Sequence, residues 1–529
     1  MRKSYPILLL SLLTTCFLYG QKHDYIYIEQ DDSQPPAVGI KLTFSDSLNG
    51  LNIDTTTVIG QLGWSPTLAD KEGNFLCFSN TYHLYDDVNR LAINGNRIAP
   101  GYTLNYRINN FDYHLGRAVH QGSAFFPITD SIFILIHSSY EDWPGAPDWD
   151  LDVSENGNVL GWYSEGIYYS ELRLRADGRM EVTSDKKKLR LLDGTFLRMA
   201  MTFVKHANGK DWWIIVPEHY TENGRKLLLR TDSGEIELKG SGFFSKLNDR
   251  FCNFRVNVPS PNGKYVATYI NLWWDGYGLQ NKLEIKKFDR CSGDFELLHL
   301  DSFPLAPNYI GGTGDVEWSE DGRFLYVALG EFLLQMDMHT DNPFDNIDTV
   351  YHVTDPVIYA GFLPEAIEEL WRLPNGEILV VSFNSTPYLS YIRKPHLKGE
   401  ACQFEYVTDT LPPDLRWPDE NLNVEIKTLP SFPPYRMPPL DYDCETSIDE
   451  PEHQSDVFVS LYPNPAWSET TVQIHGAQIK QARMLDINGR QVLETEGHGR
   501  FDVGSLPSGV YFVEVETDRG VFVRKLVIR

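Results

Sequence analysis

The segment Val256-Asn-Val-Pro-Ser-Pro-Asn262-Gly263-Lys-Tyr-Val-Ala267 decides the fold, because it contains a complete β-hairpin signal. Alternating apolar residues flank Asn262-Gly263, and a type I′ turn, with positive φ at both central residues, connects strands in such a pair. The pattern recurs with its turn glycine at positions 209, 322 and 376. Steps of 54, 59 and 54 residues between these glycines predict a β-repeat protein.

Weaker copies extend the repeat toward the N-terminus. One has its turn at Gly73, and a degenerate copy, without the glycine, turns at Asp130, 57 residues later. A second strand pair lies between consecutive hairpins, as in residues 170–182 and 282–298. Four strands in every ~55 residues are typical of a propeller blade.

We therefore predict an all-β protein whose residues 21–427 form a seven-bladed β-propeller. Six units can be counted, and the seventh is expected to form when residues 25–44 pair with residues 404–427, which would remove the free sheet edges. An open β-solenoid is the structural alternative. The long step from Asp130 to Gly209 contains an acidic insertion, residues 141–157, which we interpret as a loop on one face of the disc.

The amino-acid composition changes twice after the repeats. Residues 428–456 are rich in proline and then in acid, which predicts a linker. Residues 457–529 return to short alternating strands broken by turns, which predicts a small antiparallel β-sandwich of about seven strands.

The first twenty residues have the pattern of a secretory signal peptide. Arg2 and Lys3 precede an apolar run at residues 7–17, and Gly20 precedes the expected cleavage point. A lipoprotein signal with Cys16 as the lipidated residue is the alternative. No later segment approaches the ~20 apolar residues that a spanning helix needs, so we predict no transmembrane segment.

The final domain resembles the type A C-terminal sorting domain of the type IX secretion system, known from Bacteroidetes. Four ordered motifs carry the resemblance: Tyr462-Pro-Asn-Pro465, Asp486-x-x-Gly-Arg490, Leu506-Pro-Ser-Gly-Val-Tyr-Phe-Val513 and Lys525-Leu526-Val527-Ile528. The resemblance implies export across the outer membrane by that machinery, removal of the domain, and release or attachment to surface lipopolysaccharide. It also implies that the strands at residues 457–462 and 523–528, with Lys525, Leu526, Val527 and Ile528, carry the sorting signal.

The middle region resembles, more loosely, the large propeller domains with tryptophan-aspartate or YVTN-like repeats that precede such sorting domains. The matching sequence segments are residues 69–80, 288–293, 399–404 and 429–436. No activity follows from this resemblance, which bears on fold and export alone.

Composition limits the partners. Lys and Arg total 47 against 73 Asp and Glu, a net charge of −26 spread along the chain, which argues against nucleic-acid and anionic-lipid partners. Five cysteines remain after the leader, none with C-x-x-C spacing, so a zinc site is not expected. Cys252 and Cys291, which lie in one repeat, are the preferred disulfide pair.

A search for catalytic motifs finds no nucleophile elbow, zinc-protease helix, phosphate-binding loop or dinucleotide fingerprint. The chain also has no room for the α/β-hydrolase domain of propeller peptidases. We assign no catalytic residue and no cofactor. Acids on separate blades could still converge as a glycosidase pair, which sequence cannot reveal.

Two weaker candidates concern the loops. Alternating acids of the insertion are candidate calcium ligands, although a solvated acidic loop is the simpler interpretation: Asp148, Asp150 and Asp152. Four tryptophans outside the repeated strands are candidates for stacking against a glycan or another ligand: Trp143, Trp149, Trp273 and Trp274.

The resulting hypothesis is a secreted or cell-surface propeller protein with a binding or scaffold role toward a protein or glycan. The alternative is an extracellular polysaccharide hydrolase or lyase on a propeller scaffold. The central channel discriminates between them, since clustered acids beneath an open groove favour the enzyme and a plugged channel favours binding.

Overall fold

The computed structural model describes residues 22–24, 26–30, 37–44, 51–58, 66–80, 82–98, 121–138, 163–197, 200–218, 221–246, 252–272, 280–304, 314–359, 363–382, 388–410, 432–440, 444, 458–462, 466–475, 478–486, 489–496, 499–518 and 520–528. The chain divides into two compact units, Met1–Asp443 and Cys444–Arg529.

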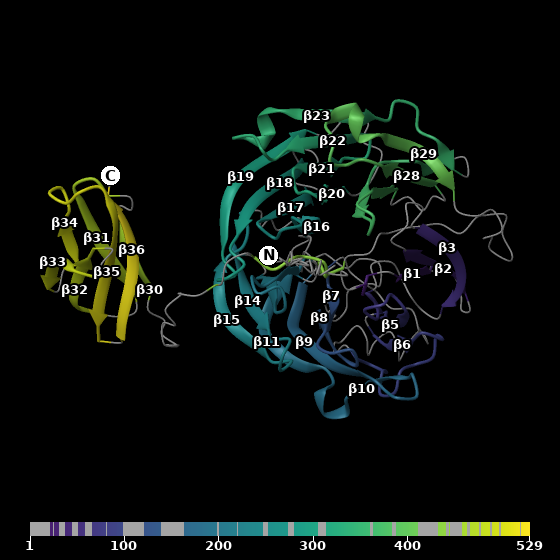
Figure 1. The fold of residues 1–529 in the computed structure, drawn as a ribbon, viewed down its shortest axis with the longest axis horizontal. Coiled ribbons are helices and arrows are strands. Elements are labelled where there is room, and N and C mark those ends of the chain that lie inside the picture. Colours follow the sequence, from purple (N-terminus) through teal and green to yellow (C-terminus); the bar gives the residue numbers. More distant parts are fainter. Residues whose placement is uncertain are drawn as a thin grey trace, which may run out of the picture. The chain divides into compact units, whose positions relative to one another are not determined.

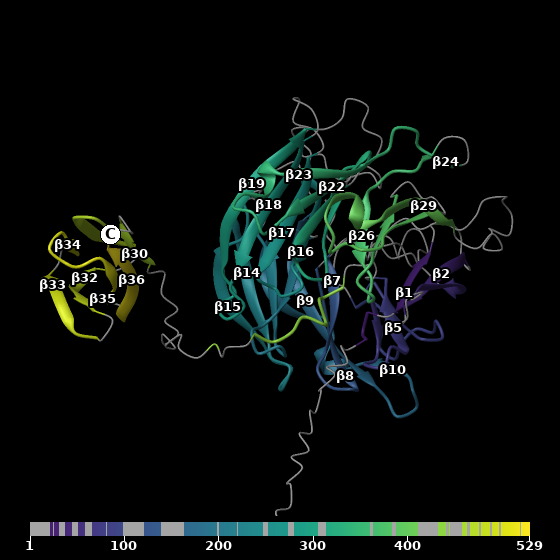
Figure 2. The ribbon, with the colours of Figure 1, turned by 45° about the horizontal axis from the view of Figure 1, so that its top comes forward.

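The described part of the first unit is built of antiparallel sheet. Seven sheets of three to five strands form a ring, seen face-on in Figure 1 and tilted in Figure 2. In chain order the sheets are β1–β3 (Ile26–Gln30, Ala37–Phe44, Leu51–Val58), β4–β6 (Thr67–Ala69, Phe75–Ser79, Leu84–Asp86), β7–β11 (Ser123–Pro127, Ile132–Ser138, Tyr163–Leu174, Met180–Val182, Leu189–Leu197), β12–β15 (Thr202–Lys205, Trp212–Pro217, Asn223–Leu229, Ile236–Phe243), β16–β19 (Cys252–Pro259, Tyr265–Leu272, Gln280–Phe288, Phe295–Pro304), β20–β23 (Asp315–Trp318, Phe324–Ala328, Phe332–Asp337, Ile347–His352) and β26–β29 (Glu369–Arg372, Ile378–Val381, Tyr388–Ile392, Phe404–Thr410).

Smaller elements complete this unit. Strands β24 (Ile358–Tyr359) and β25 (Leu363–Pro364) form a two-stranded sheet. Among the described residues there is no α-helix, only three short 3₁₀ turns at Ser184–Lys186, Pro343–Asp345 and Gly399–Cys402. The expectation of an all-β propeller is therefore confirmed.

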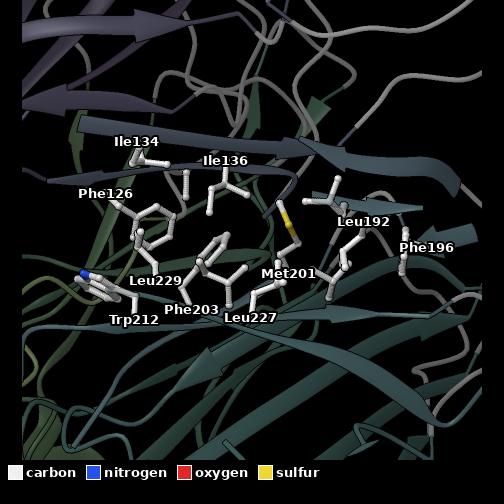
Figure 3. Close-up of a cluster of buried hydrophobic side chains, with 14 of the residues drawn as sticks. Phe126, Ile134, Ile136, Leu192, Phe196, Met201, Phe203, Trp212, Leu227 and Leu229 are labelled. Atoms are coloured by element: carbon white, nitrogen blue, oxygen red, sulfur yellow. The ribbon is translucent and has the colours of Figure 1, made fainter. Parts of the chain in front are cut away.

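Clusters of buried apolar side chains join each sheet to the next around the ring. The largest lies between β7–β11 and β12–β15, and Figure 3 shows Phe126, Ile134 and Ile136 of the first sheet facing side chains of the second. Phe126 lies edge-on to Trp212, with ring centroids 5.4 Å apart. Burial of these side chains, at about 25 cal/mol per Å² of apolar surface, is the main force that holds neighbouring sheets together.

The ring closes differently from the prediction. Residues 404–410 form β29 and pair with β28, whereas β1, β2 and β3 pair with one another. Closure is by packing, because Leu42 and Phe44 of β2 contact Trp371 and Leu379 of the last sheet. The third strand β3 supplies the hydrogen-bond partners of β2 locally, so no distant strand is required. The seven-blade count stays a prediction, since two of the seven sheets have three described strands.

The repeated turns are hairpin turns, but their type differs from the prediction. Gly209 has a φ of 69°, whereas Asn208 is not among the described residues with positive φ, which excludes type I′. The Gly209 N–H donates to the His206 carbonyl oxygen at 2.9 Å. Asn208 Oδ1 instead accepts the backbone N–H groups of Lys210 and Asp211, at 2.9 and 3.0 Å, so the asparagine stabilises the turn through its side chain.

The second unit is the predicted antiparallel sandwich. Its sheets have the strand orders β30–β31–β34 and β33–β32–β35–β36, with bounds Phe458–Tyr462, Glu469–His475, Ile479–Leu485, Gln491–Glu496, Arg500–Asp502, Gly509–Thr517 and Gly520–Ile528 for β30 to β36. A core that includes Met484, Val513 and Leu526 holds the sandwich together.

Candidate functional site

Residues 432–440, which we call the strap, pack against the propeller unit, with Pro433, Tyr435 and Met437 buried and Arg436, Pro438 and Pro439 exposed. Tyr435 is buried, and its hydroxyl donates to the Phe125 carbonyl oxygen at 2.8 Å. Its ring lies edge-on to His23, with centroids 5.4 Å apart, and Lys205 Nζ donates to the Tyr435 carbonyl oxygen. The composition of residues 428–456 predicts a linker, whereas the strap is part of the core.

Proline makes this placement possible. Four of the nine strap residues are prolines, which have no backbone N–H that would need a partner when buried. The N–H groups of Tyr435 and Met437 donate within the strap, to the carbonyl oxygens of Pro433 and Pro434, and that of Leu440 donates to the Ala207 carbonyl oxygen at 2.8 Å. A proline-rich stretch can therefore pack along a β-sheet core without a hydrogen-bond ladder of its own.

Arg290 anchors the strap and is itself only 2 % exposed. Its guanidinium donates to four carbonyl oxygens, those of Lys205, His206, Asn262 and Pro438, at 2.7 to 3.0 Å. Each charge-assisted bond of this kind contributes roughly 1.5–3 kcal/mol. One buried cation therefore connects two neighbouring sheets to the strap.

A cavity of ≈ 400 Å³ lies between the strap and the first strands of three sheets, β16, β20 and β26. Phe432 and Tyr435 of the strap, together with Trp371, supply an apolar side. Asp315, Glu317 and Arg372 supply a polar side. The cavity therefore combines aromatic surface with a few charged side chains, as ligand sites commonly do.

Two buried acids of β20 line the cavity and join it to β26. Asp315 Oδ2 accepts the backbone N–H of Leu370 at 3.0 Å, and Glu317 Oε2 accepts that of Arg372 at 3.3 Å. The other oxygen of each carboxylate accepts the N–H of the next residue on its own strand. Desolvation raises the pKa of both carboxyl groups, well above the usual value for Asp315.

The Arg372 side chain lies near two carboxylates, with no hydrogen bond or ion pair to either of them among the described residues. Its Nη1 is shielded from solvent and has no hydrogen-bond partner among the described residues. Desolvation raises the pKa of Asp24 and Glu317, and the Arg372 charge opposes this rise at both. Asp24 is instead paired with Arg436 at 2.5 Å. The Arg372 guanidinium is thus close enough to lower the pKa of two carboxyl groups, and its Nη1 still has no hydrogen-bond partner among the described residues.

The residues singled out from the sequence as ligand or metal candidates lie outside the described residues: Trp143, Trp149, Trp273, Trp274, Asp148, Asp150 and Asp152. Within the described part of the chain, no group of three or more His, Cys, Asp or Glu is placed to hold a metal. The cavity residues were missed by sequence reasoning. The available signal was the alternation Asp315-Val-Glu317-Trp, which puts two acids on one face of a repeat strand.

The predicted disulfide between Cys252 and Cys291 is wrong. The register places Cys252 opposite Leu272, whose next partner is Gln280, whereas Cys291 follows Phe288 at the other end of β18. Eight residues of strand, about 27 Å at ~3.4 Å per residue, separate the two ends, far beyond disulfide reach. Cys291 takes part in a disulfide bond, and Cys77 and Cys402 are free and buried.

The terminal motif of the sandwich is part of its core. Leu526 and Ile528 are 0 % and 3 % exposed, and both belong to the buried cluster. The Ala466 N–H donates to the Val527 carbonyl oxygen at 2.8 Å, which fixes the start of β31 to the end of the chain. Two of the four predicted sorting residues therefore stabilise the folded sandwich.

The first unit is a propeller of antiparallel sheets and the second is an antiparallel sandwich, so the chain is a two-unit β protein. Residues 460–529 match the model of the secretion system C-terminal sorting domain. The chain thus carries a type IX secretion sorting domain, which makes it a substrate of that machinery and a secreted or cell-surface protein. No helix in the described parts of the chain has the length and apolar character required to cross a membrane.

Solved structures with similarity to the chain include a protein from Lactobacillus plantarum (11% identity, 73% of this chain, 96% of that chain, TM-score 0.37) and a 6-phosphogluconolactonase candidate from Bacteroides uniformis (12%, 74%, 97%, 0.40). An oligogalacturonate lyase from Vibrio parahaemolyticus is similar at 11% identity, over 69% of this chain and 96% of that chain, with a TM-score of 0.30. A comparison with curated proteins found no match. Function does not follow from such distant likenesses.

Proposed function

We propose that the protein is an exported binding protein, whose propeller unit takes up its ligand in the cavity beside the strap. The observation that carries this proposal is the unfilled donor of Arg372 in a cavity of ≈ 400 Å³. A solvent-shielded N–H donor without a hydrogen-bond partner is costly in a folded protein and calls for an explanation. A bound ligand supplies one.

The chemistry of the two acids supports binding over catalysis. Asp315 and Glu317 have a structural role, because each of their carboxylate oxygens accepts one backbone N–H and these bonds join β20 to the inner edge of β26. A carboxylate oxygen can accept a second hydrogen bond, so a ligand hydroxyl can still be bound there. The strap also borders the cavity, as expected for a plugged channel and not for an open groove.

The runner-up is a polysaccharide hydrolase or lyase. It is favoured by one observation, two neighbouring carboxyl groups with raised pKa values in one cavity. Incubation with polysaccharides, followed by assays for new reducing ends and for unsaturated products, separates the two functions. Turnover that is lost in Asp315→Asn while folding is preserved would replace binding by catalysis.

The binding role is tested with the chain without its expected signal peptide, residues 21–529, on glycan and protein arrays. We expect one ligand class to be retained, with an affinity that falls in Arg372→Met. Absence of any ligand on both arrays would contradict the proposal.

We also infer the details of export from the sequence: a signal peptide at residues 1–20, a source in the Bacteroidetes, removal of the sorting domain, and attachment to surface lipopolysaccharide or release. Expression of chains with and without residues 457–529 in a host with the type IX system tests this inference. The full chain should reach the cell surface or medium and lose its last domain, whereas the shortened chain should stay in the periplasm.

A further inference from the structure

The charged side chains that line the cavity indicate the chemical class of its ligand. Arg372 Nη1 is a donor without a partner, and its charge acts on Asp24 and Glu317 without an ion pair to either among the described residues. A group that both accepts and donates fits between such a cation and such an anion. A hydroxyl group does this, since its oxygen accepts from guanidinium and its hydrogen is donated to carboxylate.

Charged ligands fit less well. Five acids line the cavity or its rim, against two arginines. An anionic ligand would satisfy Arg372 but would meet the surrounding carboxylates, including Glu320 and Asp321 at the turn after β20. A cationic ligand would satisfy the acids but would leave Arg372 unfilled and repel it. A neutral ligand with several hydroxyl groups satisfies both.

The apolar side of the cavity complements the same ligand. Trp371 and Phe432 lie next to each other, with ring centroids 5.8 Å apart, and both line the cavity with Tyr435. Sugar rings present an apolar C–H face and a rim of hydroxyl groups, so they match a cavity that has aromatic rings on one side and charges on the other. The volume of ≈ 400 Å³ is at the lower end of ordinary ligand sites, which suits the end of a short chain of sugars.

We propose that this cavity binds a neutral oligosaccharide, held by hydroxyl groups that bridge Arg372 to the neighbouring carboxylates. The proposal rests on the binding role inferred above and names its ligand class. It also assigns Arg372 as the residue that selects hydroxyl-rich ligands. The contribution of Asp24 is indirect, because Arg436 already occupies that carboxylate at 2.5 Å.

The experiment is calorimetric titration of the chain spanning residues 21–529 with four neutral tetrasaccharides: cello-, xylo-, manno- and maltotetraose. Tetragalacturonic acid and the glucosamine tetramer serve as anionic and cationic counterparts. We expect at least one neutral probe to bind and neither charged probe to bind more tightly. Arg372→Met should weaken binding at least about 10-fold, the loss expected for one charge-assisted hydrogen bond.

Two further variants make the result specific. Arg175→Met, an exposed arginine of the β9–β10 turn whose partners are Asp177 and Glu181, should bind as the original chain does. Arg372→Gln keeps a donor and should recover part of the affinity lost in Arg372→Met. Because no described hydrogen bond involves the Arg372 side chain, both Arg372 variants should melt within a few degrees of the original chain.

Failure has distinct forms. Tighter binding of tetragalacturonic acid, or equal affinity in Arg372→Met, would overturn the neutral-sugar assignment while leaving a binding protein. Failure of all six probes, together with retention of a protein partner on the arrays, would also overturn it. Only failure on every array would remove the binding role itself.

Discussion

Alanine at Gly209 tests whether the strap belongs to the propeller core. Gly209 has a φ of 69°, and a Cβ there would lie 2.8 Å from Pro439 Cβ and 3.0 Å from Pro439 Cα. Gly322 is the matched control, because its φ is 71° and the nearest atom to an added Cβ, Pro261 Cδ, is 3.6 Å away. The two positions share the backbone cost and differ in the strap contact.

The magnitudes follow from this comparison. A non-glycine residue in the left-handed region costs roughly 1–2 kcal/mol, which applies to both variants. Overpacking adds about 1–3 kcal/mol only at Gly209, since Pro439 is rigid and part of the strap backbone. We expect Gly322→Ala to lower the free energy of unfolding by about 1.5 kcal/mol and Gly209→Ala by about 3.5 kcal/mol.

Urea unfolding of the full chain, followed by tryptophan fluorescence, measures both variants. The m-values should agree with that of the original chain, so that midpoints report stability. If the strap were a free linker, the added methyl group would meet nothing and the two variants would lose the same stability. Equal losses would therefore refute the placement of the strap.

Three further predictions concern other buried groups. Leu526→Ala should destabilise the sandwich by about 3 kcal/mol and block export, because the domain unfolds. The control Val523→Thr, at a position 37 % exposed, should change stability by less than about 0.5 kcal/mol. Thermal melts measure the stability of both variants, and secretion assays measure their export. Burial lowers the pKa of Lys205 to about 8, so between pH 8 and 10.5 the unfolded chain binds one more proton than the folded chain. The free energy of unfolding should therefore rise over that pH range, by up to about 3 kcal/mol. Urea titrations at each pH measure this rise, which Lys205→Met should abolish. Tyr435→Phe should cost about 1–3 kcal/mol, because the Phe125 carbonyl loses its donor, and a loss below about 0.5 kcal/mol would contradict the buried hydrogen bond.

The hairpins were predictable because their signal is local. A turn glycine and the alternating residues on either side of it specify a strand pair within fifteen residues, which is why the turns at Gly209, Gly263, Gly322 and Gly376 all connect paired strands. The turn type was wrong for an equally local reason. Asn208 satisfies the turn through its side chain, an option that the Asn-Gly pair alone does not reveal.

The cavity could not be predicted, because its parts come from distant repeats. Asp315 receives the N–H of Leu370, 55 residues later, and Arg372 acts on Asp24 across most of the unit. The Cys252–Cys291 pairing failed similarly, because membership of one repeat says nothing about which end of a blade a residue occupies. Sequence spacing determines which residues are neighbours along a strand. The contacts of the cavity and the positions of the cysteines depend on how the sheets are arranged in the closed ring.

The boundary between the units follows the same logic. Composition places the end of the propeller before residue 428, where prolines begin, yet the contacts of Tyr435 and Arg436 reach back to His23 and Asp24. These pairs join residues 412 positions apart, so the ring and the strap depend on both ends of the unit being present. Prolines usually mark a linker because they oppose regular structure, but the buried Arg290 donates to the Pro438 carbonyl oxygen and holds the strap against the sheets. What distinguishes the two cases is the supply of partners for the carbonyl oxygens, and that supply becomes visible only once the sheets surround the strap.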